Sequence, residues 1–247
     1  MHHAIEPSIH YWGTPVVLIS TLNEDGSTNL APMSSAWWLG WSCMLGLDAS
    51  SKTTENLRRS GECVLNLPSD TMVEAVNGLA LTTGSPAVPL HKKLLGYRHV
   101  SDKFEAAGLT PTPSMVVTPQ RAHECPVQME AVVEDIRPFA GGDPRMGVPA
   151  VCVEVRIVKV HVLSDILMAG HEHRIDPDQW HPLLMSFREL YGRGEKLQKS
   201  RLARGPEEAY APWKHTGIKG LAGKALVAWS RHRYGGSEQP AGADTHS

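Results

Sequence analysis

The chain has 247 residues, of which 41% are hydrophobic and 20% are charged. This length is enough to bury one large core or two small ones. The formal net charge of −2 lacks the basic excess of a nucleic-acid-binding protein, and no run approaches the roughly 20 apolar residues that span a bilayer. We therefore expect a globular protein that acts on a small molecule and binds neither nucleic acid nor membrane.

Cysteine and histidine placement argues against secretion and against a metal centre. Residues 1–13 contain no basic region followed by an apolar one, so we expect no signal peptide. The four cysteines are widely spaced and form no C-x-x-C pair, which favours reduced, structural thiols in a cytoplasmic protein. The two histidines of "HEH" at 171–173 have no obvious third ligand, so no metal site is expected.

The first third of the chain alternates β-branched runs with turn signals. A strand is expected at 14–22, and Asp25-Gly26 predicts a hairpin to a return strand from Thr28, because the glycine accepts positive φ. Further strands are expected at 41–50 and 62–68. The intervening segment, 51–61, predicts a helix that is entered through Ser or Thr and ends at Gly61.

The remaining chain continues this pattern with more irregular stretches. A helix is expected at 69–80, and 82–112 reads as a long excursion with one short helix at 101–108. Strands are expected at 114–119, 125–139 and 149–165, then a short helix within 175–194 and an amphipathic helix near 220–231. Antiparallel strands joined by hairpins favour a closed or split β-barrel over a doubly wound sheet.

The segment "NLAPMSSAWWLGW", residues 29–41, combines small polar side chains, a proline and three tryptophans. Pro32 stiffens the backbone, and small neighbours would let main-chain groups approach a flat ligand. The alternative is a strand that buries tryptophan on one face. Because adjacent strand residues point to opposite faces, Trp37 and Trp38 cannot stack on one ring. We assign Trp37 to the ligand and Trp38 to packing.

The segment "SKTT" suits a phosphate. Lys52 supplies positive charge, and Ser51, Thr53 and Thr54 supply hydroxyl groups. A helix that begins here would add free N–H groups and the positive end of its dipole. The alternative is a plain helix N-cap with an exposed lysine. The spacing of a Walker loop is absent.

Several blocks in order resemble the flavin reductase-like family with the FMN-binding split barrel. They are "PVVLISTLNEDGSTNLAPMSSAWWLGW", "SKTTENLRRSGECVLNLP", "SDKFEAAGLTPTPS" and "HECPVQMEAVVEDI". The resemblance implies a mainly β fold, a six-stranded antiparallel Greek-key split barrel with inserted and peripheral helices. It also implies a homodimer with one FMN per subunit near the interface. We expect this domain at 1–192, with its core at about 14–165, then a helical extension at 193–236 and a disordered tail at 237–247.

The same resemblance assigns candidate FMN-binding residues by position. Residues of the second expected strand would follow the isoalloxazine edge, Ser20 and Thr21 would face the same site, the "SKTT" segment would hold the phosphate, and Asn56 would lie nearby. Besides Ser51, Lys52, Thr53 and Thr54, the set includes Asn29, Leu30, Ala31, Pro32, Met33, Ser34, Ser35, Ala36 and Trp37.

One departure from the family leaves the electron donor open. The late Gly-Asp-His motif that the small reductases associate with the nicotinamide cofactor is replaced here by "VRIVKVHVLSD". The basic excursion that carries His91, Lys92 and Arg98 could instead meet an anionic substrate or a nicotinamide phosphate, although a solvated loop explains it as well.

Two functions follow from the resemblance. The first is a reductase that takes hydride from NAD(P)H at flavin N5 and passes electrons to free flavin, oxygen or a partner monooxygenase. The alternative is an FMN electron carrier without a nicotinamide site. In either case the cofactor carries the chemistry, and no side chain is expected to act as a catalytic acid, base or nucleophile.

Overall fold

The computed structural model describes residues 1–200, 224–225, 228–230 and 232–233. The chain divides into two units, Met1–Glu195 and Lys196–Ser247. Most of the helix expected near 220–231 and all of the tail expected at 237–247 lie outside the described residues. The fold below is that of the first unit.

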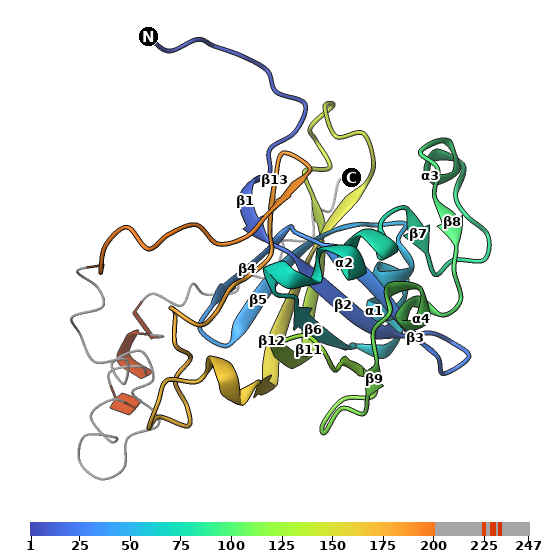
Figure 1. Cartoon of the computed structure of the whole chain (residues 1–247). Helices are drawn as coiled ribbons and strands as arrows, with labels where there is room; N and C mark the ends of the chain where they lie inside the picture. Colours follow the sequence, from blue (N-terminus) through green and yellow to red (C-terminus); the bar gives the residue numbers. More distant parts are fainter. Residues whose placement is uncertain (201–223, 226–227, 231, 234–247) are drawn as a thin grey trace. The chain divides into compact units, whose positions relative to one another are not determined.

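A seven-stranded antiparallel sheet organises this unit (Figure 1). Its spatial order is β3 (Thr28–Met33), β2 (Val17–Leu22), β6 (Glu62–Leu67), β11 (Val127–Phe139), β12 (Ala150–Val162), β5 (Ser42–Asp48) and β4 (Ala36–Leu39). Only Ser34 and Ser35 separate β3 from β4 in sequence, yet the two strands are opposite edges of the sheet. The N–H of Gly46 donates to the carbonyl of Ser35 at 2.8 Å. The sheet thus curls into the predicted mainly β split barrel, with seven strands in this sheet where six were expected.

The start of strand β2 and the residue before it, Val16–Ile19, are apolar at every position. Val17 and Ile19 face the barrel interior, where they join core residues of β5, β6, β11 and β12. Val16 and Leu18 belong to a second core, formed with Leu30 and the helices outside the barrel. Because successive side chains alternate between faces, a stretch of strand that packs on a core at both faces needs consecutive apolar residues. The hairpin predicted at Asp25-Gly26 joins β2 to β3, and Gly26 has a φ of +83°.

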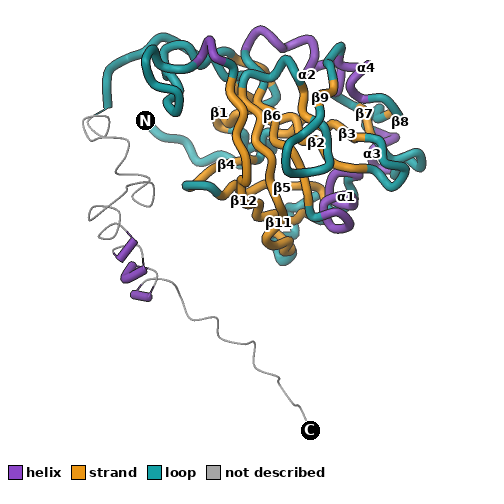
Figure 2. Tube along the Cα trace, turned by 90° about the horizontal axis from the view of Figure 1, so that it is seen from below, coloured by secondary structure: helices purple, strands orange, loops and turns teal. Residues whose placement is uncertain are grey.

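Helices cover the outside of the barrel (Figure 2). Helix α1 (Lys52–Ser60) matches its prediction: Ser51 caps its N-terminus and Gly61 ends it in the left-handed conformation. Helices α2 (Val73–Leu79) and α4 (Lys103–Ala107) pack on each other and on β3. The other short elements are α3 (Leu90–Leu94), η1 (Asp70–Met72), η2 (Ser164–Ile166), β1 (Trp12–Pro15), β7 (Thr82–Thr83), β8 (Arg98–His99), β9 (Pro111–Thr112), β10 (Arg121–Ala122), β13 (Leu184–Ser186) and β14 (Glu189–Tyr191).

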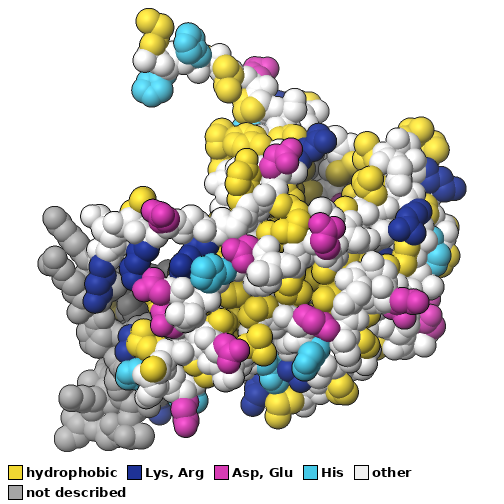
Figure 3. Space-filling view, viewed as in Figure 1, with side chains coloured by type: hydrophobic (Ala, Val, Ile, Leu, Met, Phe, Trp, Pro, Cys, Tyr) yellow, Lys and Arg dark blue, Asp and Glu magenta, His cyan; other side chains and the backbone are white. Residues whose placement is uncertain are grey.

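The prediction of a short helix within 175–194 is wrong. That segment contains the hairpin β13–β14, whose first strand pairs with β1. Strand pairing with β1 satisfies the backbone groups that a helix would have bonded internally. The hairpin and β1 carry exposed aromatic residues, and Trp12 stacks edge-on against Phe187 with 4.5 Å between ring centroids. Figure 3 shows hydrophobic side chains gathered in this region.

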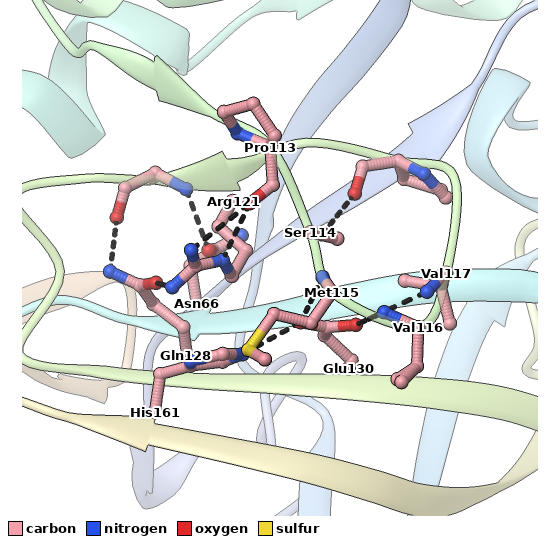
Figure 4. A network of polar contacts seen from close by, with 12 residues as sticks. Asn66, Pro113, Ser114, Met115, Val116, Val117, Arg121, Gln128, Glu130 and His161 are labelled. Atoms are coloured by element: carbon pink, nitrogen blue, oxygen red, sulfur yellow. Dashed lines mark hydrogen bonds and ion pairs between the residues drawn. The ribbon is translucent and has the colours of Figure 1, made fainter.

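The strand expected at 114–119 is also wrong, for an instructive reason. The N–H groups of Met115, Val116 and Val117 donate to the carboxylate of Glu130 at 2.8, 2.6 and 3.1 Å. Donors used in this way are not available to a strand ladder, so the segment wraps around one buried side chain (Figure 4). His161 Nε2 lies 2.6 Å from the same carboxylate.

Candidate functional site

A pocket of about 580 Å³ lies where β3, the end of β5, the start of α1, the loop after α2, helix α3 and the β13–β14 hairpin meet. Much of the predicted FMN-binding set lines it. The predicted residues in its wall are Asn29, Ala31, Pro32, Met33, Ser34, Ser35, Ser51, Lys52, Thr53 and Lys92. Residues from distant segments of the chain are therefore brought to one cavity.

The other predicted residues lie behind or beside this wall. Leu30 is buried in one apolar core, because it alternates with Asn29 and Ala31, which line the pocket. Ala36 is buried in the other core. Trp37 is 56% exposed and lies outside the pocket lining. Its neighbour Trp38 packs against the barrel core, as expected. Ser20, Thr21, Thr54, Asn56, His91 and Arg98 also lie outside the lining.

A buried layer of polar side chains supports the pocket from below. Asn56 donates to Thr21 Oγ1 at 3.1 Å and to Asn23 Oδ1 at 2.8 Å, which ties α1 to β2. Asn66 donates to Ser20 Oγ at 2.9 Å. Four members of this predicted set thus position strands and helix rather than line the cavity: Ser20, Thr21, Thr54 and Asn56.

At the start of α1, the structure confirms the N-cap, and phosphate binding stays a prediction. Ser51 Oγ accepts from the N–H of Thr54 at 3.1 Å, and the Thr54 hydroxyl donates to the carbonyl of Asp48 at 2.8 Å. These two side chains hold the helix end. Lys52 and Thr53 lie at the pocket, and Lys52 Nζ pairs with Glu55 at 2.6 Å.

Asn29 and Gly84 meet at the same end of the pocket. The Asn29 side chain is 2% exposed, and its amide donates to Thr53 Oγ1 at 3.4 Å. Its Oδ1 atom is buried and has no hydrogen-bond partner in the described part of the chain. A Cβ on Gly84 would lie 2.4 Å from that oxygen and 3.3 Å from Lys52 Cγ. Only glycine at position 84 therefore keeps open the space between Asn29 Oδ1 and Lys52, which we call the cradle.

Lys103 reaches the pocket from α4. Its side chain is buried, and Nζ donates to Thr82 Oγ1 at 2.7 Å and to the carbonyl of Leu30 at 3.4 Å. Both partners are uncharged. Burial, helped by the nearby charge of Arg98, lowers the pKa of Lys103 to about 8. An ammonium has three N–H donors, and two are used by these contacts.

Lys92 is the member of the basic excursion that reaches the pocket wall. Its Nζ lies 3.1 Å from Asp48 Oδ2, and His91 Nε2 lies 3.7 Å from the same oxygen. Burial would raise the pKa of Asp48, but hydrogen bonds from Ser50 and the charge of Lys92 outweigh it, so that pKa lies below its usual value. Arg98 is exposed in β8, outside the lining.

The opposite end of the pocket is formed by the N-terminal segment and the C-terminal hairpin. The hydroxyl oxygen of Tyr11 lies 3.2 Å from Ser35 Oγ. The backbone carbonyl of Tyr11 accepts a hydrogen bond from the N–H of Phe187 at 2.9 Å. Tyr11 and Arg188 both line the cavity. The long sequence separation between these segments explains why no local pattern predicted them.

Sequence reasoning also missed residues with readable signals. Lys103 lies within "SDKFEAAG", a helix signal and part of a block of the family resemblance from which no site residue is predicted, and Gly84 lies in the excursion. Asp48, Thr82 and Thr83 line the pocket as well. His161, in place of the family's Gly-Asp-His motif, bonds Glu130 and lies outside the lining.

The described residues contain no group of three or more His, Cys, Asp or Glu side chains that could hold a metal ion. They also include no helix with the length and apolar character needed to cross a membrane.

Comparisons with known proteins identify the family of this chain. The family model described as "Flavin reductase like domain" matches residues 9–192. YdfE, an uncharacterized protein of Bacillus subtilis (strain 168), is 40% identical over 196 residues, which cover 79% of this chain and 91% of that protein.

Solved structures show the same fold. Flavoredoxin of Desulfovibrio vulgaris (Miyazaki F) has a TM-score of 0.66 at 20% identity, covering 83% of this chain and 100% of that one. Nitrilotriacetate monooxygenase component B from Bacillus cereus has a TM-score of 0.63 at 20% identity, covering 81% and 99%. The chain belongs to the flavin reductase-like domain family.

Proposed function

We propose that this chain binds FMN in the pocket and acts as an oxidoreductase that takes hydride from NAD(P)H and passes electrons to free flavin, oxygen or a partner protein. The observation that carries the proposal is the buried Asn29 Oδ1 atom, without a partner among the described residues and held open by Gly84. A buried acceptor is costly unless a donor reaches it. A ribityl hydroxyl of FMN is such a donor.

The two ends of the pocket fit the two ends of FMN. Lys52, Thr53 and the start of α1 offer charge and donors to a phosphate at the Asn29 end of β3. At about 3.3 Å per residue, β3 places Met33 about 13 Å from Asn29. There Pro32 and the small residues Ser34 and Ser35 leave room for a planar ring along the main chain.

When bound, FMN supplies a hydride acceptor at N5 and exchanges electrons with the next acceptor. The chain's own residues bind and orient it. Lys103 holds a proton at Nζ beside the pocket, and its positive charge favours an anionic ligand there. The apolar side chains of Val16, Leu79 and Met185 keep part of the wall dry.

We also propose a homodimer in which exposed aromatic residues meet a second copy. Trp12, Trp37, Leu39 and Phe187 are exposed on β1, β4 and the β13–β14 hairpin, and β1 contacts β4. Apolar surface of this kind is typical of an interface. The likeness to a monooxygenase component B supports a partner monooxygenase as one electron acceptor.

The alternative function is an FMN electron carrier without a nicotinamide site. The observation that favours it is the engagement of His161 by Glu130, away from the pocket. The fold similarity to a flavoredoxin is compatible with it. Steady-state oxidation of NADH and NADPH by the FMN-loaded chain separates the two, because a carrier would turn over neither.

The test of the FMN site uses the whole chain. We expect the purified protein to take up FMN with a bound-flavin absorption spectrum. Lys52→Gln should weaken FMN binding about tenfold and leave riboflavin binding unchanged, because riboflavin lacks the phosphate. Lys93→Gln, an exposed lysine of α3, is the matched control. Equal losses for FMN and riboflavin, or no flavin uptake at all, would contradict the proposal.

A further inference from the structure

Strained backbone gathers at the pocket. Four residues other than glycine have positive φ in the described part of the chain: Leu81, Ala140, Phe187 and Arg188. Leu81 and Arg188 line the pocket, and Phe187 is next to Arg188. Only Ala140, between β11 and β12, lies away from it. Such strain clusters at functional sites, where the surrounding structure enforces it.

The strain at Phe187 and Arg188 belongs to one tight turn. Ser186 pairs with Glu189 across the hairpin, which leaves these two residues as the connection. Their φ values are +48° and +74°, the pattern of a type I′ turn. That turn normally uses Asn-Gly or a similar pair, because side chains with a bulky Cβ substituent disfavour positive φ. A bulky aromatic followed by an arginine is a costly choice for turn formation alone.

Contacts on one side of the turn hold it in this conformation. The N–H of Phe187 donates to the carbonyl of Tyr11, and its ring stacks edge-on against Trp12. Tyr11 is in turn tied to Ser35 at the pocket wall. Phe187 thus anchors the hairpin, and Arg188 is left at the pocket.

Arg188 differs from the other cations that line the cavity, because each of those has a polar partner within the protein. Lys52 and Lys92 each pair with a carboxylate, and Lys103 donates to a hydroxyl and a carbonyl. Among the described residues, the Arg188 side chain has no ion pair or hydrogen-bond partner, and the residue is exposed. It lies at the Ser35 end, away from the proposed site of the FMN phosphate at Lys52.

We propose that Arg188 is a specificity residue that binds a phosphate group of a second ligand, the electron-donating dinucleotide, while FMN occupies the pocket. A guanidinium can bind a phosphate through two parallel N–H donors. Because the turn is already held in place, little backbone conformational entropy is lost when the side chain binds. This inference rests on the proposed function, since it places a second ligand beside bound FMN.

The test measures binding of inorganic pyrophosphate to the FMN-loaded full-length chain by calorimetry, so that the FMN phosphate already occupies its own end. Arg188→Gln removes the charge and keeps the strain, and Arg188→Gly removes both. Ala140→Gly relieves strain elsewhere and serves as the matched control. We expect both Arg188 variants to bind pyrophosphate about tenfold more weakly, and Ala140→Gly to bind it as the wild type does.

Melting temperature and kinetics complete the test. Arg188→Gly and Ala140→Gly should both raise the Tm by about 2–4 °C, since glycine accepts positive φ. Only the Arg188 variants should raise the KM for NADH or NADPH, with kcat nearly unchanged. This combination of a more stable protein and weaker binding is not expected of a residue with only a structural role.

Two results would overturn the inference: pyrophosphate that fails to bind the wild type, or that binds Arg188→Gln as tightly. A wild type that binds pyrophosphate but oxidises neither NADH nor NADPH would instead refute the proposed reductase function. The binding measurement therefore tests the role of Arg188, and the turnover measurement tests the reductase function, independently of each other.

Discussion

Two buried charges, Glu130 and Lys103, have opposite surroundings. The Glu130 carboxylate is 0% exposed and accepts from three backbone N–H groups, with His161 beside it (Figure 4). Lys103 is 1% exposed and contacts only a hydroxyl and a carbonyl. Burial opposes the charged form of both groups.

The outcome for the two charges is opposite as well. Burial raises the pKa of Glu130, but its hydrogen bonds outweigh this effect and bring that pKa below the usual value, so the folded protein favours the carboxylate. Nothing comparable offsets the burial of Lys103, whose pKa falls to about 8. A buried charge with a full set of partners anchors a loop. A buried charge at a pocket that lacks a full set of hydrogen-bond partners is suited to bind a ligand that supplies the missing partner.

The largest expected effect is the loss of stability in Glu130→Gln. The glutamine amide would place donors against backbone donors, so we expect the free energy of unfolding to fall by about 3–4 kcal/mol. Urea unfolding measures it. Glu134→Gln, on the same strand but in an exposed pair with Arg156, should cost less than about 1 kcal/mol. Equal losses of unfolding free energy in the two variants would show that the buried Glu130 contacts stabilise the fold no more than an exposed ion pair does.

The same carboxylate predicts an acid-side pH dependence. Because the folded-state pKa of Glu130 is below its ordinary value of 4.5, its stabilising contribution is complete above that value. The contribution is lost as the pH falls through the lower, folded-state pKa. The difference in unfolding free energy between wild type and Glu130→Gln should therefore shrink in acid.

A smaller effect of opposite sign is expected from Lys103→Met. With a folded-state pKa of about 8 against 10.5, the ammonium costs the ligand-free protein up to about 3 kcal/mol at pH 7, part of which is offset by the bonds lost. The variant should be more stable without flavin and should bind FMN about tenfold more weakly. Lys93→Met is the control.

The pH dependence of the ligand-free protein checks the sign of this effect. Between about pH 8 and 10.5 the unfolded chain binds the proton that folded Lys103 has lost, so this group makes stability rise with pH over that range. Lys103→Met should lack that rise. If Lys103→Met were less stable than the wild type and bound FMN with the same affinity, Lys103 would be a structural charge like Glu130 and would have no role in ligand binding.

The smallest expected effect on stability comes from Gly84→Ala. The new Cβ would meet Asn29 Oδ1, which must shift, at a cost of about 1–2 kcal/mol. FMN affinity should fall at least tenfold because the cradle is filled. Gly141→Ala, whose Cβ would meet nothing within 4 Å, should change neither quantity. If Gly84→Ala bound FMN as tightly as the wild type, the space beside Asn29 Oδ1 would not be part of the FMN site.

Local patterns predicted the elements that depend on local physics. The cap and end of α1, the Asp25-Gly26 hairpin and the strands of the barrel follow from capping, turn geometry and alternation. The strand expected at 114–119 failed because its donors go to a carboxylate that comes about 15 residues later in the chain. The helix expected within 175–194 failed because β1, far away in sequence, pairs with that segment.

The sequence by itself determined the family and the part of the pocket on β3 and α1, because small residues and a capped helix start are local features. Only the tertiary structure decided which of these residues line the cavity and which support it, since alternation along β3 sends Leu30 to a core and Asn29 to the pocket. It also decided that Gly84, Lys103 and Arg188 join them. Their contribution depends on packing between distant segments, which no local pattern encodes.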